Sequence, residues 1–301
     1  MSNGDVRTVR AGRRTVEVHR PDKVLFPGAD GAKEYTKGDL VDYYRSVAPF
    51  MVPQLRGRPL MLERHPDGLA GPRFMQKNTP EGYPEWISRV EVPKEGGTVR
   101  HTVCDDKATL TLHRWLSRAG SENHPDRMVF DLDPAGDDDF EAVREAARLL
   151  GELLDELKLP SALMTTGSRG LHVIVPLDGR HDFDEVRAFA KDAADTLVAG
   201  HPDLLTTAAR KKDRGDRLYL DVQRNGYAQT AVAPFAVRAK PGAPVATPVA
   251  WSQLDDPDLD ARRWTVVDAV EQARTRPWAG VLSKGRALGP ARRRLNALMS
   301  Y

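Results

Sequence analysis

Short apolar segments recur along the chain, and several of them alternate between apolar and polar positions. This pattern predicts β-strands. We expect strands at residues 15–19, 59–63, 99–104, 127–132, 162–165, 171–176, 217–222 and 231–237. Between them lie segments whose apolar residues return at three- and four-residue steps, which is the period of an amphipathic helix. The predicted helices cover residues 35–51, 138–157 and 184–198.

The order of these elements limits the fold class. Strands and helices alternate, but without the short and even spacing of a parallel barrel. The sequence therefore predicts a mixed α/β or α+β fold with at least one largely antiparallel sheet. Thr36 is a candidate cap for the first helix, and an aspartate cluster at 137–139 favours the dipole of the second. A proline-rich connection at 240–248 leads to a segment rich in Trp, Arg and Pro, which we expect to pack on the outside.

Composition points to a soluble globular protein. Of the 301 residues, 40% are apolar and 29% are charged, which is ordinary for this class. The chain contains neither a signal-peptide pattern nor an apolar run of the roughly 18 to 20 residues that span a bilayer. Cys104 is the single cysteine, so an intramolecular disulfide is impossible. These features fit a reducing cytoplasm.

The net charge of +2 hides strong local differences. Residues 126–156 contain eleven acidic and three basic side chains, whereas residues 276–301 contain six basic side chains and no acidic one. The run R-K-K-D-R-G-D-R at 210–217 has five basic and two acidic residues. Alternating zones of this kind suit a protein that holds a cation in one place and a polyanion around it. Solvated surfaces produce charge runs as well.

Two carboxylates close one of the apolar strands. In V-F-D-L-D-P at 129–134, the alternation of a strand places Asp131 and Asp133 on one face and Phe130 and Leu132 on the other. Two like charges so close together are costly unless a cation lies between them. Mg²⁺ or Mn²⁺, with phosphate oxygens completing the shell, would relieve the repulsion. The alternative is a D-x-D pair that only caps the following loop.

A third acid strengthens the metal interpretation. In R-L-Y-L-D-V at 217–222, Asp221 again follows apolar positions on the reverse face. Three acids on two strands can hold two metals, which clamp the attacking and leaving oxygens of a phosphoryl displacement. Between the strands lies T-T-G-S-R-G-L-H-V at 165–173, a tight turn that can present N–H groups and a hydroxyl to a phosphate. A plain hairpin turn would have the same composition.

The motifs F-D-L-D-P, S-R-G-L-H-V and L-Y-L-D-V-Q-R-N-G-Y-A-Q-T-A-V-A-P-F-A-V-R-A-K resemble the archaeo-eukaryotic primase superfamily. They are most similar to the polymerase domain of the bacterial ATP-dependent DNA ligase D. P-D-K-V-L-F-P, Y-T-K-G-D-L-V-D-Y-Y, R-G-R-P-L-M-L-E-R-H-P-D-G and R-F-M-Q-K resemble the N-terminal half of that family. The resemblance runs from about residue 19 to residue 251 and implies a template-dependent nucleotidyltransferase.

The resemblance also implies a role for individual residues. Asp131, Asp133 and Asp221 would be the catalytic residues and hold two Mn²⁺ or Mg²⁺ ions, with an NTP or dNTP as substrate. The implied nucleotide contacts are His113, Ser168, Arg169, Gly170, His172, Arg224 and Arg238. The implied contacts to a downstream DNA 5′-phosphate are Lys23 and Lys37, and those to template DNA are Phe74, Met75 and Lys77.

For the whole chain, the resemblance implies one primase-polymerase domain with an RRM-like antiparallel core. Residues 1–118 would be an N-terminal module for 5′-phosphate and template contacts, 119–250 the catalytic core and 251–301 a basic helical segment. The implied DNA partner is a gapped or broken duplex with a 5′-phosphate. The implied protein partners are a separate ATP-dependent ligase, ligase C or ligase D, and Ku. We expect a monomer in the bacterial cytoplasm, associated with the nucleoid.

Departures from the family pattern refine this expectation. Met75 replaces a usual aromatic residue, and the region at 103–115 is shorter than in ligase D. The K-x-D-G motif of a ligase is absent from the sequence. The absent ligase motif fits a stand-alone relative, and the short region at 103–115 favours the actinobacterial branch that is associated with ligase C and fills short gaps in excision repair. Two other functions compete: a metal-dependent phosphohydrolase that uses D-x-D, and a non-catalytic module that binds DNA ends.

Overall fold

The structure is a computed structural model that describes residues 5–28, 33–106, 113–115, 118–121, 123–136 and 140–300. Its contacts divide the chain into two compact units. The first unit contains residues 1–115, 232–247 and 264–275, and the second contains 116–231, 248–263 and 276–301. Both units therefore combine segments that are distant in the sequence. In the described part of the chain, no helix is long and apolar enough to cross a membrane.

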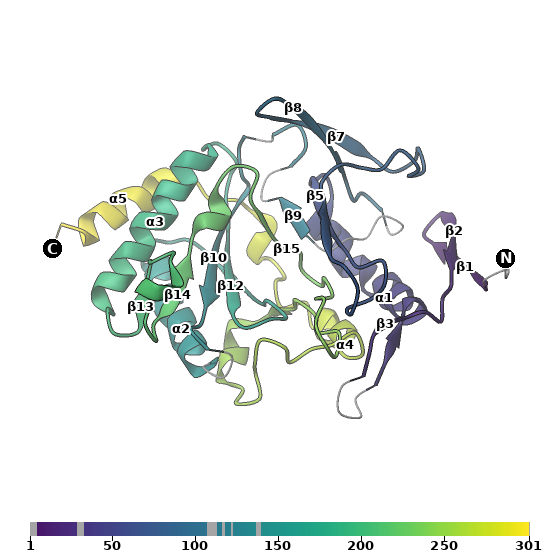
Figure 1. Cartoon of the computed structure of the whole chain (residues 1–301). Helices are drawn as coiled ribbons and strands as arrows, with labels where there is room; N and C mark the ends of the chain where they lie inside the picture. The colour runs from purple at the N-terminus through teal and green to yellow at the C-terminus, as the bar shows by residue number, and fades with distance from the viewer. Residues whose placement is uncertain are drawn as a thin grey trace. The chain divides into compact units, whose positions relative to one another are not determined.

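The second unit is built on a six-stranded sheet with the order β13-β14-β10-β12-β11-β16 (Figure 1). Its strands are β10 (Arg127–Asp133), β11 (Ala162–Thr165), β12 (Leu171–Pro176), β13 (Leu205–Thr206), β14 (Leu218–Asp221) and β16 (Pro248–Val249). Neighbouring strands are antiparallel except β13 and β14, which are parallel. The predicted antiparallel sheet is therefore confirmed, and most of its strands lie within a residue or two of their expected bounds.

Helices cover one face of this sheet. α2 (Phe140–Glu156) and α3 (Phe183–Gly200) both contact β10 and each other, and α5 (Leu288–Leu298) packs on α3. Phe130 and Leu132 of β10 are fully buried, whereas the side chains of Asp131 and Asp133 are 15% and 27% exposed. The predicted alternation along β10 is thus confirmed. The acids lie on the face that α2 and α3 leave uncovered.

The C-terminal segment is attached to the sheet through polar side chains. Trp251 donates its indole N–H to the Ser161 carbonyl at 2.9 Å, and Trp278 donates to the Leu163 carbonyl at 2.7 Å. Buried Arg144 of α2 donates to backbone carbonyls in the loop after η3 (Trp251–Asp255), including that of Leu259 at 2.6 Å. These bonds give backbone carbonyls buried between the segments a hydrogen-bond partner. The expected packing of this segment against the core is confirmed.

The first unit consists of small sheets around one long helix. Its strands are β1 (Val6–Ala11), β2 (Arg14–His19), β3 (Val24–Phe26), β4 (Tyr35–Thr36), β5 (Leu60–Arg64), β6 (Phe74–Gln76), β7 (Arg89–Lys94), β8 (Gly97–Thr102) and β9 (His113–Trp115). Its helices are α1 (Lys37–Leu55) and α4 (Ala269–Arg274). Val47, Met51 and Leu55 of α1 are fully buried. Thr36 caps α1 in a capping box with Asp39, as the sequence predicts.

One predicted strand is wrong over most of its length. We expected a strand at 231–237, but β15 (Thr230–Val232) ends at Val232. Pro234 has no N–H to donate to a ladder, and Phe235 has φ 66°, outside the range of a strand. The chain turns there instead. The aspartate cluster at 137–139 lies outside the described residues.

Candidate active site

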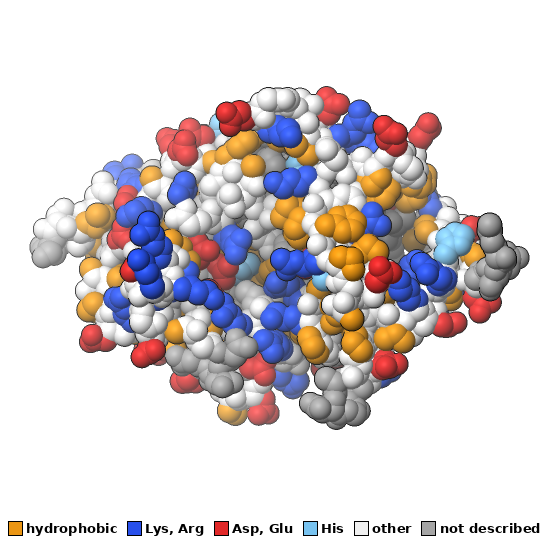
Figure 2. Space-filling model, in the orientation of Figure 1, with side chains coloured by type: hydrophobic (Ala, Val, Ile, Leu, Met, Phe, Trp, Pro, Cys, Tyr) orange, Lys and Arg blue, Asp and Glu red, His pale blue; other side chains and the backbone are white. Residues whose placement is uncertain are grey.

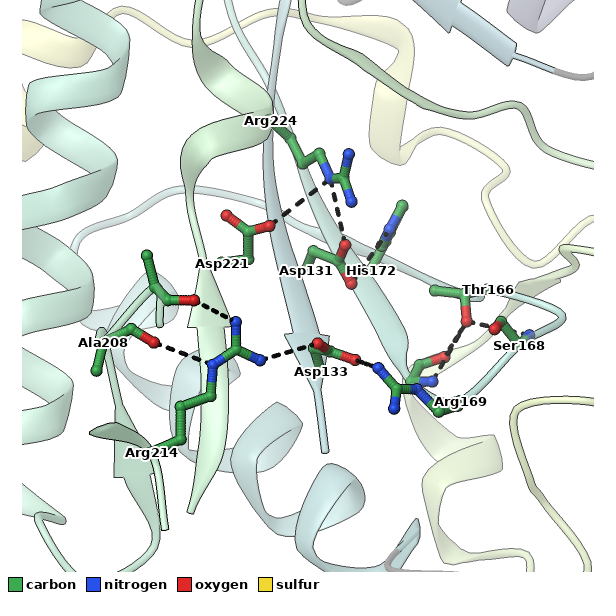
Figure 3. Close-up of polar contacts among 12 residues, drawn as sticks. Asp131, Asp133, Thr166, Ser168, Arg169, His172, Ala208, Arg214, Asp221 and Arg224 are labelled. Carbon is green, nitrogen blue, oxygen red and sulfur yellow. Dashed lines mark hydrogen bonds and ion pairs between the residues drawn. The ribbon is translucent and has the colours of Figure 1, made fainter. Parts of the chain in front are cut away.

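Three carboxylates lie on the neighbouring strands β10 and β14 (Figure 3). Asp131 and Asp133 lie on the exposed face of β10, and Asp221 is the last residue of β14. Asp131 and Asp221 are directly opposite each other in the antiparallel register. Side chains in such a pair have Cβ atoms about 4.5–5.5 Å apart, and like charges there are destabilising. The fold therefore concentrates negative charge at this point.

Cationic side chains compensate Asp131 and Asp221. Arg224 Nε lies 3.4 Å from Asp131 Oδ2 and 3.8 Å from Asp221 Oδ2, and it bridges the opposed pair. His172 stands opposite Asp131 on β12, with Nε2 3.5 Å from Asp131 Oδ1. Burial alone would raise the pKa of Asp131, but His172 and Arg224 together hold it below its usual value. Asp131 is therefore ionised at neutral pH.

Two arginines hold Asp133. Arg169 donates to Asp133 Oδ1 at 2.7 Å, and Arg214 donates to Asp133 Oδ2 at 3.2 Å. The guanidinium of Arg214 also donates to the carbonyls of Ala208 and Ala209 and stacks over Tyr219, 3.9 Å from the ring centroid. The position of Arg214 is therefore fixed from several sides. Arg214 belongs to the basic run at 210–217, but the sequence pattern did not predict it as a site residue.

Asp221 is oriented by neutral donors. The Gln223 N–H donates to Asp221 Oδ1 at 2.7 Å, and the Tyr219 hydroxyl donates to the same oxygen at 3.2 Å. Burial raises the pKa of Tyr219 to about 12, and the nearby Asp221 charge contributes. Tyr219 thus stays protonated and remains a donor. Tyr219 was not predicted as a site residue either. The only sign in the sequence is that Tyr219 lies two positions before Asp221 and therefore on the same face of the strand.

The three aspartates are chemically suited to bind a divalent cation, although their carboxylates do not converge on one point. Among the described residues, no group of three His, Cys, Asp or Glu side chains converges closely enough to hold a metal ion. Instead, arginine side chains form ion pairs with the carboxylate oxygens. Hard carboxylate oxygens are the ligands that Mg²⁺ and Mn²⁺ prefer. The residues therefore fit a metal that takes over the charge compensation from these arginines.

The G-S-R-G turn lies directly against the end of β10. A Cβ on Gly170 would be 1.7 Å from the Leu132 carbonyl oxygen, so only glycine fits. The N–H groups of Ser168 and Gly170 both point at Thr166 Oγ1, at 3.3 Å, rather than outwards. Arg262 from the C-terminal segment donates to the Ser168 carbonyl at 2.7 Å. The turn is thus rigidly held, with Arg169 as its charge next to Asp133.

The loop that leads into β14 on the second unit carries exposed basic side chains. Arg210, Lys211 and Lys212 are exposed in the loop that leads into β14. Figure 2 shows Lys and Arg side chains gathered over the β13–β14 region. No ion pair is recorded for these three side chains among the described residues. A polyanion could therefore lie beside the acids, as the charge pattern of the sequence suggested.

In the first unit, the two predicted phosphate lysines share a basic cluster. Lys37 donates to the His19 carbonyl at 2.9 Å, and Lys23 donates to the Pro66 carbonyl at 2.5 Å and to Asp67 at 3.2 Å. Desolvation lowers the pKa of Lys37, and the charges of Arg20 and Lys23 lower it further. Arg20, which the sequence analysis missed, therefore belongs to the cluster. Mutual repulsion of this kind favours a bound anion.

The other predicted contact residues belong to the first unit. Phe74 and Met75 of β6 are 44% and 40% exposed, and Lys77 is also exposed. Arg238 donates its backbone N–H to the Pro244 carbonyl at 2.8 Å. The backbone of His113 pairs with Met61, but its side chain lies outside the described part of the chain. The roles of these residues stay predictions.

Comparison with known proteins decides the family. The model of the family described as "LigD, primase-polymerase domain" matches residues 36–278. The chain belongs to the LigD primase-polymerase family. This confirms the resemblance and makes the chain a member of a family of metal-dependent nucleotidyltransferases. The association with the ligase C branch stays a prediction.

Relatives and a solved structure agree with this LigD assignment. The chain is 31% identical to the multifunctional non-homologous end joining protein LigD of Mycolicibacterium smegmatis over 85% of its length, and 33% identical to LigD of Mycobacterium tuberculosis over 83%. It spans about a third of these relatives, 35% and 34% of their lengths. The solved polymerase domain of M. tuberculosis ligase D in complex with DNA matches with a TM-score of 0.81 at 30% identity, covering 90% of this chain and 99% of that one. The predicted fold is confirmed.

Proposed function

We propose that this chain is a template-dependent polymerase that adds NTPs or dNTPs to a primer 3′-hydroxyl at short gaps or breaks in DNA. The observation that supports it best is the opposed pair Asp131 and Asp221 with Asp133 beside it, next to a rigid turn that carries Arg169. Membership of the LigD family and the DNA in the solved relative support DNA as the substrate class.

In the proposed reaction, the primer 3′-hydroxyl gives up its proton to solvent, its oxygen forms a bond to the α-phosphorus of the nucleotide, and the bond to the pyrophosphate leaving group breaks. Asp131, Asp133 and Asp221 would hold Mn²⁺ or Mg²⁺, which neutralise charge on the attacking and leaving oxygens. Arg169 and His172 lie on the same face as Asp131 and Asp133, where they can contact the triphosphate. The protein mainly positions these groups, as is usual in phosphoryl transfer.

The arginines would couple metal binding to substrate binding at this site. As long as Arg169, Arg214 and Arg224 neutralise the carboxylates, like-charge repulsion is relieved without a metal. When a cation binds, the released guanidinium groups become available to phosphate oxygens, which they bind well in bidentate fashion. Substrate phosphate and metal would therefore bind together, because the metal would pair with the carboxylates and the phosphate with the guanidinium groups.

Primer extension tests the proposal. The substrate is a labelled primer on a gapped duplex with a downstream 5′-phosphate, supplied with Mn²⁺ and either NTPs or dNTPs. We expect template-directed extension by the wild type and a loss of at least about 100-fold in Asp131→Asn, because each metal ligand acts as part of one unit. Asp184→Asn, an exposed acid on α3, is the matched control. If the wild type did not extend the primer, the proposal would be wrong.

The repair context follows from the product. Filling a gap leaves a nick, so a DNA ligase must complete the repair; we propose a separate ATP-dependent ligase, and Ku where the substrate is a broken end. The family relatives are non-homologous end joining proteins. Comparing a one-nucleotide gap with two broken ends that have complementary overhangs separates excision-repair filling from end joining.

A further inference from the structure

A single short turn after β14 contacts both of the opposed acids. η2 (Gln223–Asn225) begins two residues after Asp221. Its first residue donates a backbone N–H to Asp221, and its second, Arg224, bridges Asp221 and Asp131. Its third residue, Asn225, is fully buried and faces the other way. Asn225 was assigned no role in the sequence analysis.

The side-chain amide of Asn225 makes the hydrogen bonds to β10 that a longer β14 would otherwise make. β14 pairs with β10 only from Asp133 back to Asp131, and the chain then leaves the sheet at Val222. Val129, two residues before Asp131, would be left with an unpaired and fully buried N–H and C=O. The Val129 N–H instead donates to Asn225 Oδ1 at 2.8 Å, and Asn225 Nδ2 donates to the Val129 carbonyl at 2.7 Å.

The same amide holds the start of its own turn. Asn225 Nδ2 also donates to the Val222 carbonyl at 3.0 Å, and the Asn225 backbone N–H donates to that carbonyl at 3.1 Å. Val222 directly follows Asp221. The side chain therefore ties the residue after one acid to a residue just before the other. A change at Asn225 would let the end of β14 move relative to β10.

We propose that Asn225 is a positioning residue that sets the separation of Asp131 and Asp221 and thereby the affinity for a divalent cation. It touches neither metal nor substrate and acts through Val129 and through η2. The inference rests on the proposed metal site. A carboxylate pair separated by a fixed distance binds a cation without first having to be brought together, and loosening it adds that cost to binding.

Binding of Mn²⁺ alone tests the inference without using polymerase activity. Free Mn²⁺ gives an electron paramagnetic resonance signal that disappears on binding, so titration yields the dissociation constant. We expect Asn225→Ala to weaken Mn²⁺ binding about tenfold and to shift the Mn²⁺ dependence of extension by a similar factor. We expect the KM for nucleotide at saturating Mn²⁺ to change less than twofold.

A stability control separates positioning from loss of folding. Leu295→Ala removes a fully buried side chain from α5, which packs on α3, and it lowers the melting temperature through a cavity. We expect Leu295→Ala to leave the Mn²⁺ dissociation constant unchanged. Asn225→Ser, which leaves room for a water molecule to reach Val129, replaces Asn225→Ala if that variant does not fold.

The outcomes are distinct. Absence of Mn²⁺ binding by the wild type would contradict the proposed metal site itself. Binding by the wild type together with equal affinity in the Asn225 variants would overturn the positioning role alone. Equal weakening by Leu295→Ala would also overturn it, because the effect would then reflect stability. If neither Asn225 variant folded, Asn225 would be a folding residue, and the proposal would be wrong.

Discussion

At the scale of single residues, the site is defined by charges that compete for the same oxygens. Asp133 is neutralised by Arg169 and Arg214, and both contacts must weaken when a metal binds. The free energy needed to break each ion pair therefore makes the free energy of metal binding less favourable. Partly exposed pairs of this kind contribute about 1 kcal/mol or less. At the proposed metal site, the arginines would therefore tune the affinity for a cation without preventing it from binding.

Replacing Arg214 should therefore tighten metal binding. We expect Arg214→Ala to lower the Mn²⁺ dissociation constant about twofold to fivefold, because Asp133 loses one competing cation. Lys212→Ala is the matched control, since Lys212 is an exposed cation of the same loop. Titration with Mn²⁺ in the absence of nucleotide measures the effect. Weaker binding in Arg214→Ala would show that Arg214 supports the site instead of competing for it.

The fold makes the thiol of Cys104 unreactive. It is fully buried, and burial together with Asp106 and Asp105 raises the pKa of its thiol to about 12. At pH 8 only about one molecule in ten thousand would carry the reactive thiolate. We expect no reaction of the native protein with a disulfide reagent at pH 8 and one thiol per chain in guanidinium chloride. Fast labelling of the native protein would contradict this burial.

At the scale of elements, the close approach of the G-S-R-G turn to β10 is a strict requirement. Gly170 has no room for a Cβ against the Leu132 carbonyl, although its φ does not itself demand glycine. We expect Gly170→Ala to displace the turn, to destabilise the protein by about 2 kcal/mol or more and to raise the KM for nucleotide. Gly200→Ala, with open space around its Cβ, is the control. Urea unfolding and extension kinetics measure both effects.

Local sequence patterns predicted elements well where periodicity and burial agree. β10, β11 and β12 were predicted closely because their apolar runs are continuous, and α1 because Thr36 provides a cap. The pattern failed at 231–237, where apolar residues continue through a turn around Phe235. A buried turn and a buried strand have the same composition, so periodicity cannot separate them.

The candidate site was predictable only in part for a similar physical reason. Asp131, Asp133 and Asp221 were found because acids are unusual at the ends of apolar strands. Arg214 and Asn225 were not, because their importance comes from contacts with residues 81 and 96 positions away. Family resemblance supplied roles, whereas long-range geometry supplied the partners that hold the acids in place.

At the scale of the whole molecule, a net charge of +2 is too small to attract DNA by itself. Local clusters must therefore provide the electrostatic part of binding. In the first unit, burial lowers the pKa of Lys37, and repulsion from the nearby charges of Arg20 and Lys23 lowers it further. A bound 5′-phosphate would relieve this repulsion. The cluster should thus distinguish a phosphorylated DNA end from an unphosphorylated one.

Salt dependence of binding tests this cluster quantitatively. Each phosphate contact contributes about 0.9 to the slope of log K against log salt. We expect Lys37→Ala to reduce the slope by about one on gapped DNA with a 5′-phosphate, and to change little when the end carries a hydroxyl. Lys158→Ala, an exposed lysine of the second unit, should leave both slopes unchanged. If Lys37→Ala weakened binding to both ends equally, the lysine would contact the duplex backbone, and the 5′-phosphate assignment would be wrong.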